Sequence, residues 1–158
     1  MNQIPPYQLW VGHAGDGRAA EAILAQGIRA VIQLALEEPP LQLPREFIYL
    51  RFPLLDGSGN DPALLRLAID GVAKLVGAGT PTLVCCGVGM SRSPAIVAAA
   101  LAIGEQADLN ETLARVLRFH PGDVSPGLWA EVCRLASVGD FGRTRQSGQA
   151  ILKLIGLQ

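Results

Sequence analysis

The sequence predicts one α/β domain in which helices cover both faces of a mostly parallel central sheet. Three observations lead to this fold class. Short β-rich apolar runs alternate with segments of helical composition, which is the pattern of βαβ units. Hydrophobic residues make up 49% of the chain and charged residues only 17%, a composition that favours a dense core over disorder. The length of 158 residues suits a single domain, and neither an internal repeat nor a linker is visible.

The first part of the chain is predicted to contain three strands and one helix. The segment 14–17, Ala-Gly-Asp-Gly, is expected to interrupt regular structure after the first strand. Gly27 stands where a helix C-terminus favours a left-handed residue. A loop opens at Glu37, and the third strand is expected to run into Pro53. The predicted elements are a strand over 8–12, a helix over 18–26, a strand over 30–34 and a strand over 47–52.

The second part is predicted to contain one further strand and several helices. Residues 56–60 include two glycines among small polar residues, so a loop that is free to move is expected there. Asp61 and Asp108 are expected to cap the helices that follow them, because a carboxylate accepts hydrogen bonds from the first amides. The predicted elements are a helix from 61, a strand over 82–85, and helices from 93, over 108–119, over 125–137 and over 146–157.

A glycine-rich loop between a buried strand and a helix carries the chemistry of this sequence. Residues 86–93 read Cys-Gly-Val-Gly-Met-Ser-Arg-Ser. The order of strand, loop and helix makes an anion site, because backbone N–H groups and the positive end of the helix dipole point at the loop. These groups and Arg92 favour the thiolate form of Cys86 and would hold the oxygens of a tetrahedral oxyanion. A thiolate beneath a bound phosphate group is placed for in-line attack on phosphorus.

The loop resembles the signature of the cysteine-dependent protein tyrosine phosphatase superfamily, which is Cys, five residues, Arg, then Ser or Thr. Cys86, Arg92 and Ser93 match this signature, and Gly89 matches its third intervening position. The sequence Gly-Met-Ser-Arg-Ser-Pro and the Ala-rich helix after it are most similar to the dual-specificity branch. The early segments that also resemble this branch are 9–12, 27–31 and 49–53. The resemblance covers most of the chain and implies a dual-specificity phosphatase-like catalytic domain over residues 1–158.

The resemblance also implies a role for each site residue. Cys86 would attack phosphorus and form a phosphocysteine, and Ser93 would hydrogen-bond the thiolate and help it leave in the second step. The general acid of this family is an aspartate on an upstream loop, and Asp56 matches its position. Asp61 is the other candidate, but its place before Pro62 explains it better as a helix N-cap. The residues that would bind the phosphoryl oxygens are Gly87, Val88, Gly89, Met90, Ser91 and Arg92.

Other cysteines and histidines are interpreted as structural. Cys85 stands where the family usually has histidine and cannot offer the same hydrogen bond. Strand alternation places its side chain on the opposite face from Cys86, so it is expected to be buried filler rather than a disulfide partner. Cys133 shares a helical face with apolar residues and is expected to be a core thiol. Neither His13 nor His120, both in predicted loops, has metal-ligand spacing, so no metal site is expected.

Charge and hydropathy exclude several classes of partner. With 13 basic and 14 acidic residues the net charge is −1, which gives no support for nucleic-acid binding. The longest apolar stretch, residues 95–103, is about half of what crosses a bilayer. With no signal peptide visible either, a cytoplasmic protein without a membrane span is expected. The pair Glu37-Glu38 is expected to be a solvated turn, and the alternative is that it rims the mouth of the site.

The leading functional prediction is a phosphatase that hydrolyses phosphomonoesters through a phosphocysteine, with neither a metal nor another cofactor. By analogy with the family, the expected partners are proteins phosphorylated on tyrosine, serine or threonine. A small phosphomonoester metabolite is an alternative substrate. A catalytically weak domain that binds phosphorylated partners is a second alternative. Chemistry of the rhodanese or arsenate-reductase type also uses a loop cysteine, but the Arg92-Ser93 ending fits phosphatases better. Nothing in the sequence indicates an oligomeric state.

Overall fold

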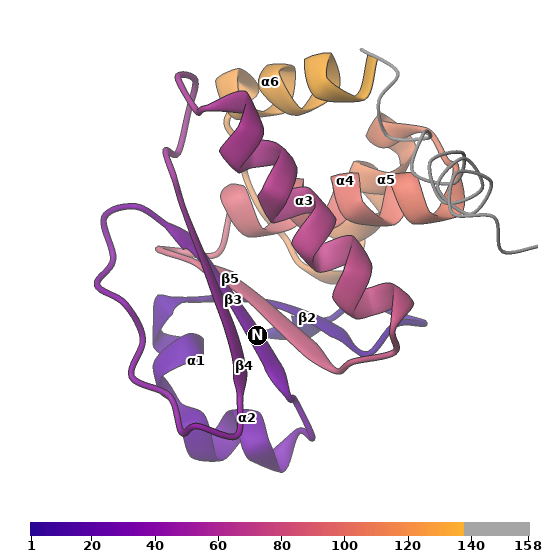
Figure 1. Cartoon of the computed structure of the whole chain (residues 1–158). Coiled ribbons are helices and arrows are strands. Elements are labelled where there is room, and N and C mark those ends of the chain that lie inside the picture. The colour runs from indigo at the N-terminus through magenta and orange to yellow at the C-terminus, as the bar shows by residue number, and fades with distance from the viewer. Residues whose placement is uncertain (138–158) are drawn as a thin grey trace, which may run out of the picture.

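The computed structural model describes residues 1–137 of the chain, and Figure 1 shows a central sheet with helices on both faces. The helix expected over 146–157, and the corresponding end of the domain expected over 1–158, lie outside the described residues. The elements in chain order are β1 (Asn2–Gln3), β2 (Leu9–His13), α1 (Ala14–Arg18), α2 (Ala20–Ala25), β3 (Ala30–Ala35), β4 (Ile48–Leu54), α3 (Pro62–Gly77), β5 (Thr82–Cys86), α4 (Arg92–Glu105), α5 (Leu109–Phe119) and α6 (Pro126–Ser137).

The five strands form one sheet in the order β1-β2-β5-β3-β4. The pairs β2–β5, β5–β3 and β3–β4 are parallel, and only β1 pairs with its neighbour in the antiparallel sense. The prediction of a mostly parallel sheet is therefore confirmed. Strand β1 was not expected, because two residues are too few to show an apolar period. Since the parallel strands share one direction, the ends of β2, β3, β4 and β5 meet at one edge of the sheet, where ligands bind in open α/β folds.

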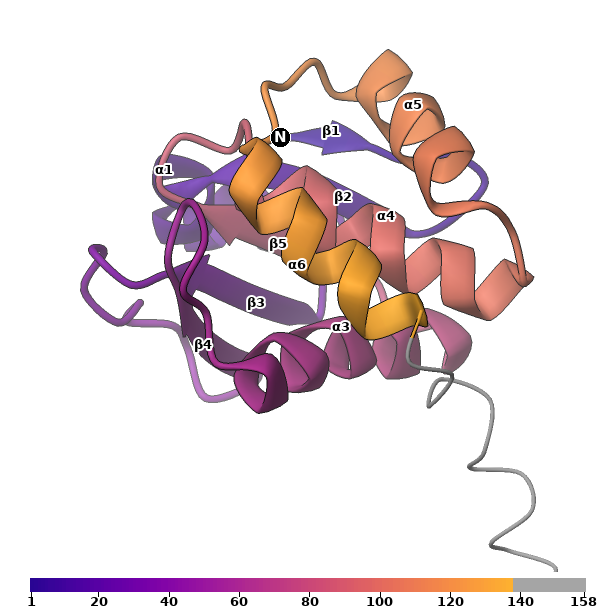
Figure 2. The ribbon, with the colours of Figure 1, turned by 90° about the horizontal axis from the view of Figure 1, so that it is seen from above.

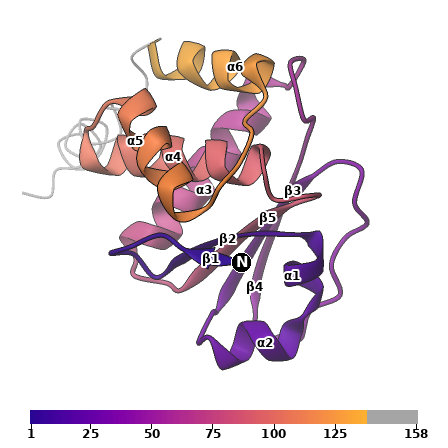
Figure 3. The same cartoon turned by 180° about the vertical axis from the view of Figure 1, so that it is seen from behind.

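Helices pack on the two faces of the sheet, as predicted. Helices α3, α4, α5 and α6 cover one face, and α1 and α2 lie on the other, as Figures 1 and 3 show from opposite sides. Figure 2 looks down on the larger helical layer and shows α4 between α3 and α5. Most of α4 is buried, and its alanines allow the neighbouring helices to approach closely. The buried helix α4 thus points its N-terminus at the sheet edge where β5 ends.

Two local predictions need correction, and one short helix was not expected. Strand β2 ends at His13, before the interruption predicted from residue 14, but residues 14–18 then form the helix α1, because the His13 ring accepts hydrogen bonds from the Gly15 and Asp16 amides and the Asp16 carboxylate accepts one from the His13 amide. The helix expected over 18–26 accordingly begins only at Ala20. Strand β4 passes through Pro53 and ends at Leu54, which an edge strand tolerates because its outer side needs no N–H donor.

The predicted helix caps are confirmed. The Asp61 carboxylate accepts a hydrogen bond from the Ala63 amide at 2.8 Å, and Asp108 caps α5 in the same way. Gly27 has a φ of +74°, the left-handed conformation expected after a helix. Within residues 1–137 no helix has both the length and the hydropathy to cross a bilayer.

Candidate functional site

The loop between β5 and α4 lies at the carboxyl edge of the sheet. Cys86 is the last residue of β5 and Arg92 the first of α4, and each is only 2% exposed. On the loop between them, Val88 is 74% and Met90 44% exposed, so these two side chains face outward. Strand, loop and helix therefore bring the predicted nucleophile and arginine together with the backbone of the loop.

Three backbone carbonyls of this loop contact polar groups of residues outside the loop. The Gly87 carbonyl accepts a hydrogen bond from the Ala14 amide at 3.1 Å, and the Met90 carbonyl accepts one from the Asp123 amide at 2.9 Å. The Gly89 carbonyl lies 2.7 Å from His120 Nε2. In a trans peptide the next N–H points opposite to the carbonyl, so the following amides are turned inward. None of the amides of residues 87–91 donates to the backbone of another described residue, which leaves them available to bind an anion.

Gly89 is required by two features of this loop. Its φ is +83°, a conformation that side-chain-bearing residues rarely adopt. A Cβ at this position would lie 2.8 Å from the Gly12 carbonyl oxygen and 3.1 Å from the His13 amide nitrogen. The structure thus gives a physical reason for the glycine in the third intervening position of the signature.

Arg92 is bound along one side of its guanidinium and open along the other. Its Nη1 donates to the Leu54 carbonyl at 2.9 Å and to Glu37 Oε2 at 2.6 Å, and its Nη2 donates to Glu37 Oε1. The buried Nε has no hydrogen-bond partner among the described residues. Because the guanidinium is planar, Nε–H and the remaining N–H of Nη2 point in the same direction and form a second fork. An oxyanion with two oxygens matches such a fork.

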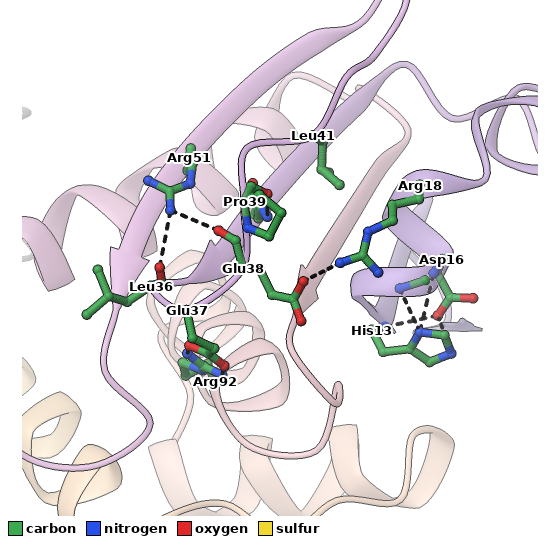
Figure 4. A network of polar contacts seen from close by, with 12 residues as sticks. His13, Asp16, Arg18, Leu36, Glu37, Glu38, Pro39, Leu41, Arg51 and Arg92 are labelled. Carbon is green, nitrogen blue, oxygen red and sulfur yellow. Dashed lines mark hydrogen bonds and ion pairs between the residues drawn. The ribbon is translucent and has the colours of Figure 1, made fainter.

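Glu37 lies on an exposed turn, as predicted, with its side chain 57% exposed, but it also reaches Arg92. Its carboxylate forms a bidentate ion pair with Arg92, and Figure 4 shows the two side chains one above the other. A Cβ on Gly87 would lie 2.7 Å from Glu37 Oε1, so the carboxylate lies directly against the loop. The hydrogen bonds from Arg92 lower the pKa of Glu37 to about 2. Glu37 therefore lies beside Arg92 and the loop, as the alternative interpretation holds for it, whereas the Glu38 carboxylate pairs with Arg18.

The segment that carries Glu37 is held by a polar network, part of which Figure 4 shows. Arg51 Nη2 donates to the Glu38 carbonyl at 3.1 Å, and the Glu38 carboxylate pairs with Arg18. Gln33 Nε2 donates to the Pro39 carbonyl at 2.8 Å. These contacts join β3, β4 and α1 to the segment, and they fix the backbone from which the Glu37 side chain reaches Arg92.

Asp56 and Asp61 follow β4 on the same side of the sheet edge. Burial by itself would lower the pKa of Arg92, but the hydrogen bond to Glu37 and the charges of Cys86, Glu37 and Asp56 together raise it. Of these influences on the pKa of Arg92, the charge of Asp56 is the smallest. The Asp61 carboxylate is engaged as the cap of α3. Side chains of Asn60 and Glu131 hydrogen-bond the backbone of this loop, which the sequence predicts to be free to move.

Ser93 and Cys85 each show a distinct environment. The buried Ser93 hydroxyl donates to the Gly12 carbonyl at 3.4 Å, and no hydrogen bond joins it to Cys86 among the described residues. Cys85 is fully buried in the core on the α1–α2 face, whereas Cys86 belongs to the core on the other face. Burial raises the pKa of the Cys85 thiol to about 12. The prediction that Cys85 is buried filler on the opposite face is confirmed.

Cys133 and the two histidines differ in part from the predictions. Cys133 is only partly buried, so it is less of a core residue than its helical face indicated. His13 caps α1, and His120 at the end of α5 contacts the Gly89 carbonyl of the loop. Sequence reasoning missed the place of His120 beside the site, because 31 residues separate it from Gly89 and no local pattern links them. No group of three His, Cys, Asp or Glu side chains in residues 1–137 is placed to hold a metal ion.

Removing Glu37 should reveal whether it orients Arg92 or only competes with a bound anion. Glu37→Gln keeps one acceptor oxygen for Arg92 and removes the negative charge, whereas Glu37→Ala removes both. We expect Glu37→Ala to bind vanadate about tenfold more weakly than Glu37→Gln, the effect of one charge-assisted hydrogen bond. Equally tight binding by both variants, above that of the wild type, would show that Glu37 acts only as a competing charge. The low pKa of Glu37 keeps the pair ionised above about pH 4, so titration calorimetry at pH 7 is suitable.

Comparison with known proteins gives different results for sequence and for fold. No protein-family model matches the sequence, and no curated protein matches it as a relative. The structure of human DUSP28 is 25% identical, with a TM-score of 0.77 over 87% of this chain and 96% of that chain. DUSP15 is 20% identical, with a TM-score of 0.72 over 92% and 94%. The human tyrosine phosphatase-like serine/threonine/tyrosine-interacting protein is 20% identical, with a TM-score of 0.73 over 87% and 96%.

Proposed function

We propose that this chain, which has the fold of the dual-specificity branch of the cysteine-dependent phosphatases, hydrolyses phosphomonoesters through a phosphocysteine intermediate. The observation that carries the proposal is the open fork of Arg92. A buried, charged donor with an unpartnered Nε lies beside inward-turned amides and next to a buried thiol. The Nε atoms of Arg51 and Arg115 are also buried without a partner, so what distinguishes Arg92 is its place beside the loop amides and Cys86, where a bound oxyanion would satisfy the donor.

In the first step the Cys86 thiolate attacks phosphorus, and the bond from phosphorus to the ester oxygen breaks. The leaving oxygen takes a proton from Asp56, so the alcohol or phenol departs neutral. Charge on the three equatorial oxygens is stabilised by the loop amides and by the Nε–Nη2 edge of Arg92. Glu37 and the Leu54 carbonyl hold the other edge of the guanidinium, which keeps this fork aimed at the phosphate.

In the second step water attacks the phosphocysteine and gives a proton to Asp56, now a base. The bond from phosphorus to sulfur breaks, inorganic phosphate leaves, and Cys86 returns as a thiolate. We assign Ser93 to stabilising that thiolate, which requires its hydroxyl hydrogen to turn from the Gly12 carbonyl toward sulfur. A thiolate nucleophile needs a reducing environment, which agrees with the expectation of a cytoplasmic protein.

Phosphoproteins carrying phosphotyrosine and phosphoserine or phosphothreonine are the substrates we propose, with small phosphomonoesters as the alternative. The rim supports a substrate with a single phosphate. Glu37 brings a negative charge next to Arg92, and the loop has no lysine to hold additional phosphate groups. The exposed side chains of Val88 and Met90 offer apolar contact to the group that carries the phosphate.

Hydrolysis of an aryl phosphate in EDTA with fresh reductant, across pH 5 to 8, tests the proposal. Turnover by the wild type that vanadate inhibits would support it. A protein that is inert but binds vanadate or a phosphopeptide would instead be a binding module. One observation favours that second function, since Cys85 replaces the histidine usual in the family and cannot hydrogen-bond as it does. Absence of both turnover and oxyanion binding would overturn both functions.

Asp56→Asn is expected to lose activity selectively toward poor leaving groups. Phenyl phosphate needs its leaving oxygen protonated, so its kcat should fall about 10²-fold or more, whereas kcat for 2,4-dinitrophenyl phosphate should change little. Asp61→Asn is the matched control, because asparagine is as good a helix cap as aspartate. Steady-state kinetics with both substrates separates the two residues. Equal losses with both substrates in Asp56→Asn, or selective loss in Asp61→Asn, would contradict the assignment of the acid.

A further inference from the structure

The loop that carries Asp56 is tied to α6 by one carboxylate. Glu131 Oε1 accepts a hydrogen bond from the Gly59 amide at 2.6 Å, although 72 residues separate the two. Glu131 Oε2 accepts one from Asn60 Nδ2 at 3.1 Å. The Glu131 side chain is only 13% exposed, and its bond to Asn60 is partly buried. A glycine-containing loop is thereby fixed to a helix that packs on the main core.

Asn60 passes this restraint to the backbone on both sides of Asp56. Its Oδ1 accepts a hydrogen bond from the Leu55 amide at 2.8 Å, and its Nδ2 donates to the Gly57 carbonyl at 3.0 Å. Leu55 and Gly57 are the two neighbours of Asp56 in the chain. The Asn60 side chain therefore bonds the backbone on both sides of the proposed acid, and Glu131 in turn hydrogen-bonds the Asn60 side chain.

Close packing at the start of α6 supports the same arrangement. A Cβ on Gly127 would lie 3.0 Å from the Ser58 amide nitrogen and 3.2 Å from the Ser58 Cβ, so the loop rests directly on the helix. Burial opposes ionisation of Glu131, but the hydrogen bonds from Gly59 and Asn60 lower its pKa below the ordinary value. The carboxylate is thus charged at neutral pH and accepts bonds through both oxygens.

We propose that Glu131 and Asn60 are positioning residues that hold the Asp56 loop in its working place before substrate arrives. This inference rests on the proposed phosphatase function and adds residues that neither touch the phosphate nor belong to the signature loop. A preformed acid loop avoids the cost of ordering it in each catalytic cycle. We call the hydrogen bonds that Glu131 and Asn60 make to this loop the clamp. Without the clamp, the two glycines at 57 and 59 would leave the loop free to move, as the sequence alone suggests.

The dependence of rate on the leaving group tests this role. In Glu131→Ala we expect kcat for phenyl phosphate to fall about tenfold, and kcat for 2,4-dinitrophenyl phosphate and vanadate affinity to stay within about twofold. Asn60→Ala should show the same selectivity, and the double variant should lose little more than either single one, because both act through one unit. Equal losses with both substrates, or fully multiplicative losses in the double variant, would overturn the proposal.

Glu105→Ala is the matched control for a purely structural loss. Glu105 is also a partly buried carboxylate that accepts several bonds, from Tyr7 and Arg115, but it lies at the far end of α4 from the loop. This variant should lower the melting temperature without changing the leaving-group dependence. If Glu131→Ala does not fold, Glu131→Gln, which keeps one acceptor oxygen, should show a smaller effect of the same selectivity.

Hydrogen exchange at the Gly59 amide distinguishes failure of this inference from failure of the proposed function. Faster exchange in Glu131→Ala than in the wild type is expected whether or not the protein turns over substrate. If exchange is faster but the wild type is inert, the clamp exists and the phosphatase proposal fails. If exchange is unchanged, the clamp is overturned even in an active enzyme.

Discussion

Cys86→Ser is expected to reduce hydrolysis of phosphomonoesters by at least about 10⁴-fold, the range seen when a catalytic nucleophile is removed. A serine hydroxyl is not ionised near neutral pH, and neither the inward-turned amides nor Arg92 can act as a general base for it. The oxyanion site itself remains, because its donors are the loop backbone and the Arg92 fork. The variant should therefore still bind a phosphopeptide while failing to hydrolyse it.

Single-turnover hydrolysis of an aryl phosphate and calorimetric binding of a phosphopeptide measure these two properties. The side chain of Cys86 is buried and serine is slightly smaller, so thermal unfolding is included to detect any loss of structure. Cys85→Ser is the control, since Cys85 is buried on the opposite face of the same strand. It should retain turnover at a somewhat lower melting temperature. Retention of turnover by Cys86→Ser would exclude the phosphocysteine mechanism.

Arg92→Lys is expected to lower kcat/KM by about 10³-fold, because an arginine that stabilises transferring phosphoryl oxygens contributes on this order. Lysine keeps the positive charge, but its single ammonium group replaces the two edges of the guanidinium, each of which carries a pair of N–H donors. In the structure one edge of Arg92 binds Glu37 and the Leu54 carbonyl while the other stays open. A lysine ammonium can hydrogen-bond Glu37 or the oxyanion, but it cannot bind both through two pairs of N–H donors as arginine does.

Arg115→Lys is the matched control for this substitution. Arg115 also pairs with a carboxylate, since its Nη2 donates to both Glu105 oxygens at 2.6 and 2.8 Å, away from the signature loop. This variant should keep full activity with at most a modest change in stability. Tungstate binding measured by calorimetry should weaken in Arg92→Lys and stay unchanged in Arg115→Lys. Near-normal kcat/KM in Arg92→Lys would show that positive charge alone, rather than the open fork, serves the reaction.

The sequence by itself determined the features that depend on near neighbours. The loop from Cys86 to Ser93 could be predicted because the strand, the glycines and the helix start are contiguous. Caps at Asp61 and Asp108 depend on amides two or three residues away. Alternation along β5 places Cys85 and Cys86 on opposite faces, because side chains along a strand have a period of two.

The tertiary structure alone decided how the signature loop is supported. Glu37 reaches Arg92 across 55 residues, and Glu131 reaches Gly59 across 72. Neither carboxylate carries a local pattern that distinguishes it from a solvated one, because its partner is chosen by the packing of β3 against β4 and of α6 against α3. The distance from each carboxylate to its partner depends on how these elements pack, and no residue spacing in the chain encodes that packing. The chain therefore specifies the groups of the site locally, and the packed sheet and helices specify which of them meet.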